Sequence, residues 1–263
     1  MRVRVERITT VGLLLMMSIA AFGWEYKSQE ADTVNSAQIR VGAAFTKHWR
    51  NGLRLGISED LRFDIYNSAT GAAFKTSFTT LNFAYVPVEY VKLDVGYTLK
   101  YMHKDTTSFH ETVRHRAFGS VTGMYTIDGL VKLSLRERVL MEARTDSVNL
   151  LEKNRYNWQL RSKIGADFIV PGKPVKPYIW CELINTLNAP EYQQKNGRQY
   201  ISQVRTQAGV KWRVSRLSSL EFYYRFTYGY DRDINITKKK GYIELAEGTL
   251  YQHAIGVTYH LDW

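Results

Sequence analysis

Apolar and polar residues alternate with a period of two through most of this chain, which constrains its fold more than any other feature. Such alternation is typical of β-strands, because successive side chains point to opposite faces. The segment LRLGISEDLRFDI, for example, places Leu53, Ile57 and Phe63 on one face and Arg54 and Arg62 on the other. The sequence therefore predicts an all-β protein built from eleven such segments, at 37–49, 53–65, 80–86, 90–102, 114–127, 130–144, 156–170, 176–187, 201–214, 220–230 and 251–263.

The connections between these segments alternate between short and long. The Asp128-Gly129 pair is a strong hairpin signal among the short connections, which lie at 50–52, 87–89, 128–129, 171–175 and 215–219. The long connections are polar and lie at 66–79, 103–113, 145–155, 188–200 and 231–250. Short turns at one end and long loops at the other are typical of outer-membrane barrels. We therefore predict a transmembrane antiparallel up-and-down β-barrel over residues 37–263.

Aromatic residues recur on the apolar face where segments enter the short turns, and the chain itself ends on one. Outer-membrane barrels carry rings of aromatic side chains at the membrane interfaces. The final segment, IGVTYHLDW, also resembles the C-terminal assembly signal of bacterial outer-membrane proteins, so we expect it to bind the barrel-assembly machinery. The predicted aromatic girdle at the periplasmic end consists of Trp49, Tyr85, Tyr125, Phe168, Trp212 and Trp263.

The number of strands depends on where the two termini lie. If both lie in the periplasm, the barrel needs an even number of strands, whereas the alternation identifies eleven. Residues 24–36 would then form either a weak additional strand or a segment inside the lumen. We expect about 12 strands, within a range of 10–12.

The N-terminus indicates export from the cytoplasm. Arg2, Arg4 and Arg7 precede the apolar run VGLLLMMSIAAFG at 11–23, and polar residues follow it. This order is typical of a cleaved signal peptide, and the run is too short for a spanning helix. We therefore predict a signal peptide over 1–23, an N-terminal segment over 24–36 and a barrel in the bacterial outer membrane, where it contacts lipid and lipopolysaccharide.

The charge of the chain raises the question of a polyanionic partner. The 36 Lys and Arg residues outnumber the 25 Asp and Glu residues, which gives a net charge of +11. Nucleic acid is one such partner, but an exported protein does not meet cellular nucleic acid, so we exclude it. The single cysteine, Cys181, excludes an internal disulfide framework and a cysteine-cluster zinc site. We expect no cofactor and no metal.

Most basic residues fall on the polar rows that would face the lumen, Arg40 and several lysines among them, and acids such as Asp60 and Glu142 are fewer there. A water-filled lumen with this wall would favour a small anionic solute. Alternatively, the charges pair into a network that fills a narrow barrel. Both interpretations predict a non-enzymatic protein, structural or a passive channel, with a basic lining of Arg54, Arg62, Arg114, Arg116, Arg136, Arg138, Arg161, Lys163, Arg205, Lys211 and Arg225.

Three glutamates, Glu59, Glu137 and Glu182, fall on apolar rows near the middle of their segments. A charge facing lipid is unfavourable, so we expect a β-bulge or a misassigned face, and contact with another subunit of a membrane complex is the alternative. A lipid-modifying enzyme, of the phospholipase or lipid A deacylase type, is a further alternative. Its best candidate residue is His253 near the outer end, although no serine stands at a telling spacing from it.

Four stretches resemble a known family. They are LRLGISEDLRFD, VKLSLRERVLMEAR, SSLEFYYRFTYGYD and the RHRAF that precedes the second of these. They are similar to the domain-of-unknown-function family 2490, whose members are predicted outer-membrane β-barrels found mainly in Bacteroidetes. The resemblance covers roughly residues 37–263. It implies a barrel fold and an outer-membrane location, and it brings no established activity and no functional residues.

Overall fold

The computed structural model describes residues 32–65, 73–103, 113–144, 155–189, 200–237 and 242–263, and the structural statements below concern these residues. They form eleven β-strands: β1 (Asp32–His48), β2 (Leu53–Asp64), β3 (Ala73–Val88), β4 (Val91–Met102), β5 (Val113–Ile127), β6 (Val131–Arg144), β7 (Tyr156–Phe168), β8 (Val175–Thr186), β9 (Tyr200–Arg213), β10 (Ser218–Thr237) and β11 (Tyr242–Asp262). No helix in this part of the chain is long and apolar enough to cross a membrane. The predicted signal peptide lies outside the described residues.

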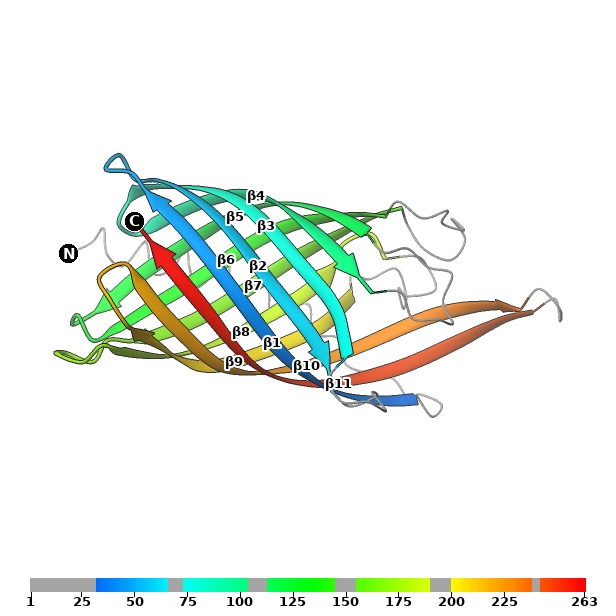
Figure 1. Cartoon of the computed structure of the whole chain (residues 1–263). Helices are drawn as coiled ribbons and strands as arrows, with labels where there is room; N and C mark the ends of the chain where they lie inside the picture. The colour runs from blue at the N-terminus through cyan, green and yellow to red at the C-terminus, as the bar shows by residue number, and fades with distance from the viewer. Residues whose placement is uncertain (1–31, 66–72, 104–112, 145–154, 190–199, 238–241) are drawn as a thin grey trace. The chain divides into compact units, whose positions relative to one another are not determined.

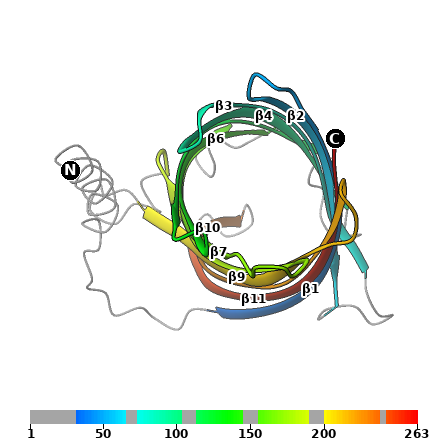
Figure 2. The ribbon, with the colours of Figure 1, turned by 90° about the vertical axis from the view of Figure 1, so that its left-hand side faces the viewer.

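The strands close into one barrel (Figures 1 and 2). Each strand pairs antiparallel with the next along the chain, as expected when short hairpins join neighbours. The ring is completed by β1 and β11, which pair in parallel from Asp32 opposite Gly248 to Thr46 opposite Asp262. The prediction of an all-β, up-and-down barrel is therefore confirmed, with one parallel pair.

The parallel seam corrects the expected number of twelve strands. The described residues form eleven, within the predicted range but odd. In a meander of alternating directions, the first and last of eleven strands run the same way, so they can close the ring only in parallel. The expectation of an even number assumed that both ends of the barrel sequence lie on one side. Instead, residues 32–36 extend β1 itself, and residues 24–31 lie outside the described part.

The two ends of the barrel differ as predicted, with two corrections. The short turns cluster at one end, where Asp128 and Gly129 both have positive φ, as a tight hairpin turn requires. Residues 73–79, expected in a loop, belong to β3. Residues 231–237 and 242–250, also expected in a loop, belong to β10 and β11, which stay paired out to Thr237 opposite Tyr242. Beyond Asp231 their ribbon projects past the other strands (Figure 1).

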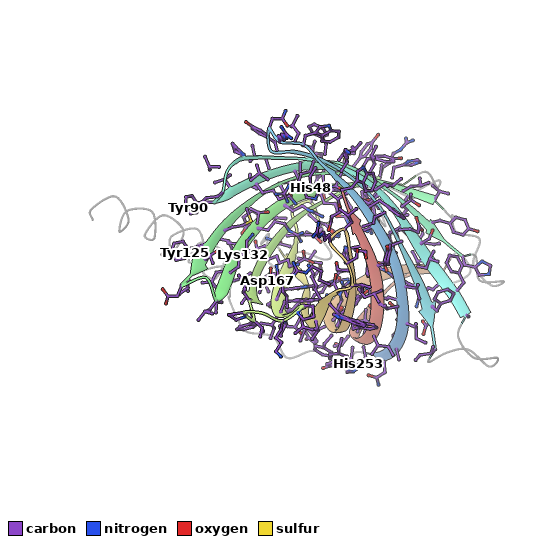
Figure 3. All side chains as sticks on the ribbon, turned by 60° about the vertical axis from the view of Figure 1, so that its left-hand side comes forward. His48, Tyr90, Tyr125, Lys132, Asp167 and His253 are labelled. Atoms are coloured by element: carbon purple, nitrogen blue, oxygen red, sulfur yellow. The ribbon has the colours of Figure 1, made fainter. Side chains whose placement is uncertain are left out.

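The two faces of the barrel wall have opposite polarity. Large apolar side chains on alternate positions, such as Ile57, Leu81 and Val95, are about half exposed on the outside. Polar side chains on the intervening positions are buried on the inside, among them Arg40 and Glu182. A water-soluble barrel has the reverse distribution, because apolar surface is the part that folding removes from water. Side chains therefore project from both sides of the wall, as Figure 3 shows.

Candidate functional site: the basic interior

The structure places the eleven predicted basic lining residues on the inward rows. Each of them occupies an alternate position on the face of its strand that also carries buried polar side chains. The strand register brings several of them directly opposite one another, Arg138 opposite Arg161 and Arg136 opposite Lys163. Like charges at directly opposed positions are unfavourable, so their neighbours have to compensate.

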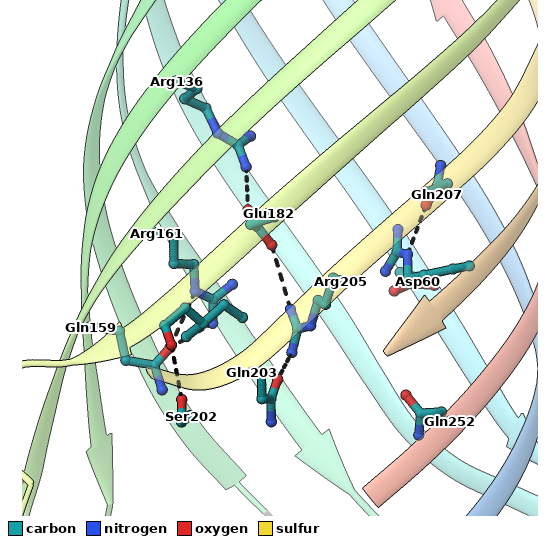
Figure 4. Close-up of polar contacts among 12 residues, drawn as sticks. Asp60, Arg136, Gln159, Arg161, Glu182, Ser202, Gln203, Arg205, Gln207 and Gln252 are labelled. Carbon is teal, nitrogen blue, oxygen red and sulfur yellow. Dashed lines mark hydrogen bonds and ion pairs between the residues drawn. The ribbon is translucent and has the colours of Figure 1, made fainter. Parts of the chain in front are cut away.

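Two buried glutamates neutralise part of this charge. Glu142 on β6 pairs with Arg114, at 2.9 Å, and with Arg116 on β5. Glu182 on β8 lies 2.7 Å from Arg136 and 3.7 Å from Arg205. Figure 4 shows the second group, in which Glu182 bridges arginines from β6 and β9. Each carboxylate therefore serves two guanidinium groups.

The inward position of Glu182 corrects its assignment to the apolar face. The sequence could not settle the parity of β8, because Tyr178, Trp180 and Ile184 make the inward row apolar as well. The other row, Ile179, Cys181 and Leu183, carries no charge, and this absence is the sequence signal that it faces outward and that Glu182 faces inward. No β-bulge is needed, since β7 and β8 pair without a register shift.

The other two glutamates do face outward. The Thr79 hydroxyl donates a hydrogen bond to Glu59 at 2.5 Å, and the Ser162 hydroxyl donates one to Glu137 at 2.7 Å. The β5–β6 and β6–β7 pairs around Glu137 are regular, so neither a bulge nor a misassigned face explains it. Each outward carboxylate is therefore satisfied by one hydroxyl from the neighbouring strand.

Several inward cations form no close ion pair with a carboxylate among the described residues. Arg161 donates hydrogen bonds to Gln159, and Arg225 donates one to Gln207 at 2.7 Å. Others lie over aromatic rings: Arg138 is 4.0 Å from the centre of the Phe118 ring, and Lys163 is 4.0 Å from that of Trp180. Such contacts stabilise a cation without cancelling its charge. The set includes Arg40, Lys100, Arg138, Arg161, Lys163, Lys211 and Arg225.

Inward glycines support the aromatic rings beneath these cations, a feature that the sequence analysis missed. The register sets Gly96 opposite Phe118, Gly165 opposite Trp180, Gly209 opposite Tyr178 and Gly256 opposite Tyr223. At Gly96, Gly209 and Gly256 an added Cβ atom would meet the aromatic ring itself, and at Gly165 it would meet the Cβ atom of Trp180. The ring can therefore lie flat against the wall, where cations then stack on it. The only signal in the sequence is a glycine on an inward row, and this signal does not identify the aromatic residue that lies opposite it on the next strand.

Arg40 is the most deeply buried of the inward cations, with 2% of its surface exposed. Its Nη2 atom donates hydrogen bonds to Gln38 at 3.2 Å and Gln252 at 3.3 Å. Its Nε and Nη1 atoms have no partner in the described structure. A buried donor without a partner costs about 1–3 kcal/mol, and more when the group is charged. Arg40 is thus held in place with part of its hydrogen-bonding capacity unused.

The six predicted girdle residues lie around the end of the barrel that carries the short turns. All are exposed, between 41% and 59% of their surface; Figure 3 labels Tyr125 there. Trp263 is tied to β1, because its N–H donates to the Thr46 carbonyl at 3.0 Å and its carbonyl accepts from the His48 N–H at 2.7 Å. The last residue therefore closes the parallel seam as well as contributing a ring.

The alternative enzymatic candidate, His253, lies on the outer face of β11. Its Nδ1 atom is 2.6 Å from the Tyr224 hydroxyl, and its ring packs against Phe226. No serine hydrogen bonds to it among the described residues, so this environment supplies no nucleophile. Within the same residues, no group of three His, Cys, Asp or Glu side chains could hold a metal ion.

Comparison with known proteins adds a family and no activity. The sequence model of one family, described as "Protein of unknown function (DUF2490)", matches residues 35–237, from β1 to the end of β10. No curated protein matches the chain. No solved structure matches it either.

Proposed function

The chain belongs to the DUF2490 family of proteins of unknown function, and on the evidence of its barrel we propose that it is a non-enzymatic outer-membrane protein whose basic interior admits small anionic solutes. Export through a signal peptide over 1–23 and assembly through the C-terminal strand are part of this proposal. Its immediate partners are then outer-membrane lipid and lipopolysaccharide.

Membrane insertion is supported by the apolar outer face. Exposed apolar side chains cover the strands on the outside, and aromatic side chains gather at the short-turn end. A monomeric water-soluble protein rarely exposes as many large apolar side chains on one continuous surface as this outer face does. Lipid satisfies such a surface, and a closed barrel leaves no strand edge unpaired within the bilayer.

The anionic solute is supported by one observation, the inward cations that form no close ion pair with a carboxylate. Glu142 and Glu182 each already serve two arginines, and Asp60 is taken by Arg62. The remaining positive charges are available to attract a negative solute, and a narrow polar channel focuses their field. A barrel whose interior only pairs its own charges would need nearly equal numbers of the two signs.

Reversal potentials across a salt gradient in planar bilayers test this proposal. We expect the barrel to pass chloride in preference to potassium, most clearly at low salt, because the screening length falls from about 30 Å at 0.01 M to about 3 Å at 1 M. The double variant Arg138→Gln, Arg161→Gln should weaken the preference. Arg136 is left intact in this variant, because it neutralises Glu182.

Two results would contradict the proposal. A preference for potassium would show that the wall charge does not control permeation. An absence of conductance from folded barrels would favour a purely structural protein, with the side chains of the interior filling the lumen.

A further inference from the structure

Three of the inward cations, Arg40, Arg62 and Arg225, lie on neighbouring strands at the seam of the barrel. Arg62 on β2 is its direct cross-strand partner. Arg225 on β10 stands opposite Ala254 on β11, which stands opposite Gln38 on β1. Both arginines interact electrostatically with Arg40. Three strands from the two sides of the seam thus bring three guanidinium groups together.

This cluster has an excess of positive charge. Asp60 is the carboxylate within it, and it lies 2.8 Å from Arg62, whereas the nearby Asp64 is paired with Lys75 at 2.6 Å. Three guanidinium groups and one carboxylate leave two positive charges. Arg225 has an amide as its hydrogen-bond acceptor, at 2.7 Å on Gln207. Arg40 has the amides of Gln38 and Gln252. Amide oxygens orient a guanidinium group without neutralising it.

The side chains around the three arginines hold them in fixed positions. The Arg62 guanidinium lies 3.9 Å from the centre of the Phe78 ring, and that of Arg225 lies 5.2 Å from the centre of the Trp180 ring. The Tyr223 ring, which lies over Gly256, is 5.4 Å from the Arg225 guanidinium. A preorganised group of donors loses little side-chain freedom when a ligand arrives.

The partly exposed arginines of the cluster define what the ligand must supply. The Nε and Nη1 atoms of Arg40 are buried in the wall, so Arg40 contributes charge, whereas Arg62 and Arg225 offer N–H groups that a solute can reach. The ligand must accept several hydrogen bonds and carry about two negative charges. Carboxylate and phosphate oxygens meet both demands, whereas chloride offers a single negative charge on one atom.

We propose that Arg40, Arg62 and Arg225 form a binding site inside the barrel for a small oxyanion with at least two negative charges, such as a phosphate or a polycarboxylate. The proposal deepens the proposed function, on which it rests for the solute's access to the lumen. The amide groups of Gln38, Gln252 and Gln207 accept hydrogen bonds from Arg40 and Arg225 and so fix the positions of these two charges. The barrel then selects among anions, beyond the general attraction of its wall.

Isothermal titration calorimetry on the full barrel in detergent micelles tests the site without requiring conductance. The probes are inorganic phosphate and citrate, each compared with sodium chloride at equal ionic strength. We expect phosphate or citrate to bind the wild type with saturation, and chloride not to. Arg40→Gln and Arg225→Gln should each weaken binding by about tenfold or more, since the first removes a positive charge behind the site and the second also removes charge-assisted hydrogen bonds.

Lys132→Gln is the matched control. It removes one positive charge from an inward row at the short-turn end (Figure 3), far along the wall from the cluster, and should leave the affinity within about twofold. Arg40→Met separates binding from folding, because an apolar side chain also removes the buried unpaired donors. That variant should melt no lower than the wild type and still fail to bind.

The outcomes distinguish the site from the general channel. Binding that is lost in both arginine variants and kept in Lys132→Gln supports the site, and the better probe identifies phosphate or carboxylate as the preferred oxyanion. Absence of binding to the wild type, equal binding of chloride, or equal loss in Lys132→Gln would overturn it. Anion selectivity without saturable binding would retain the proposed function and reject this site.

Discussion

The ring of Phe118 on β5 lies directly over Gly96, its cross-strand neighbour on β4. On the other side of the ring, the Arg138 guanidinium lies 4.0 Å from the ring centre. The inner wall is thus layered, with backbone first, then an aromatic ring, then a cation. The missing side chain of the glycine determines how close the ring can come to the wall, and hence where the charge is placed.

Gly96→Ala should destabilise the barrel by about 1–3 kcal/mol, because the added methyl group has no room. Its Cβ atom would meet the Phe118 ring and would lie 2.8 Å from the Leu81 carbonyl oxygen. Gly119→Ala on β5 is the control, since nothing lies within 4 Å of the added atom. The temperature at which the folded gel band is lost in detergent measures both. Equal melting of the two variants would show that the ring moves freely.

Glu182→Gln should lower the free energy of unfolding by about 3 kcal/mol, because it leaves two arginines without their carboxylate in a buried position. Asp262→Asn removes the acid of an exposed pair with His48 and should cost less than about 1 kcal/mol. Urea unfolding in micelles, followed by tryptophan fluorescence, compares the two. Similar losses would mean that water in the lumen screens the Glu182 pairs as well as it screens the exposed one.

Glu137→Gln should leave stability unchanged or raise it by up to about 1 kcal/mol in a lipid bilayer, because a neutral amide is cheaper than a carboxylate on a lipid-facing surface. The amide oxygen still accepts the hydrogen bond from Ser162. Folding into vesicles at increasing urea concentration measures the effect, with the buried Glu142→Gln as a control that should destabilise. A marked loss of stability in Glu137→Gln would point to a protein contact at this outer face.

Deletion of Trp263 should reduce the amount of barrel assembled in the outer membrane more than Trp212→Ala does. Both changes remove one girdle ring, but only the deletion also removes the two backbone hydrogen bonds that tie the end of β11 to Thr46 and His48. The heat-modifiable fraction in isolated outer membranes measures assembly. Equal levels of the two variants would mean that the ring alone matters.

The sequence by itself determined the local part of this structure. Alternation with a period of two is set within each strand, so it predicted the strands and the polarity of each face, as in β2, where Arg54 and Arg62 point inward and Ile57 outward. The loop asymmetry and the Asp128-Gly129 turn likewise depend on neighbouring residues. The same patterns carried the family resemblance, which the comparison confirmed.

Only the tertiary structure decided the features that depend on pairing between distant strands. The parallel closure of β1 on β11 requires residues more than 200 positions apart to meet, and no local pattern encodes it. Which face of β8 points inward is decided by the contacts of Glu182 with Arg136 on β6 and Arg205 on β9. The cluster of Arg40, Arg62 and Arg225 forms only because the seam brings β10, β11, β1 and β2 side by side. Strand register converts a list of inward charges into a particular arrangement, and register is a property of the closed barrel.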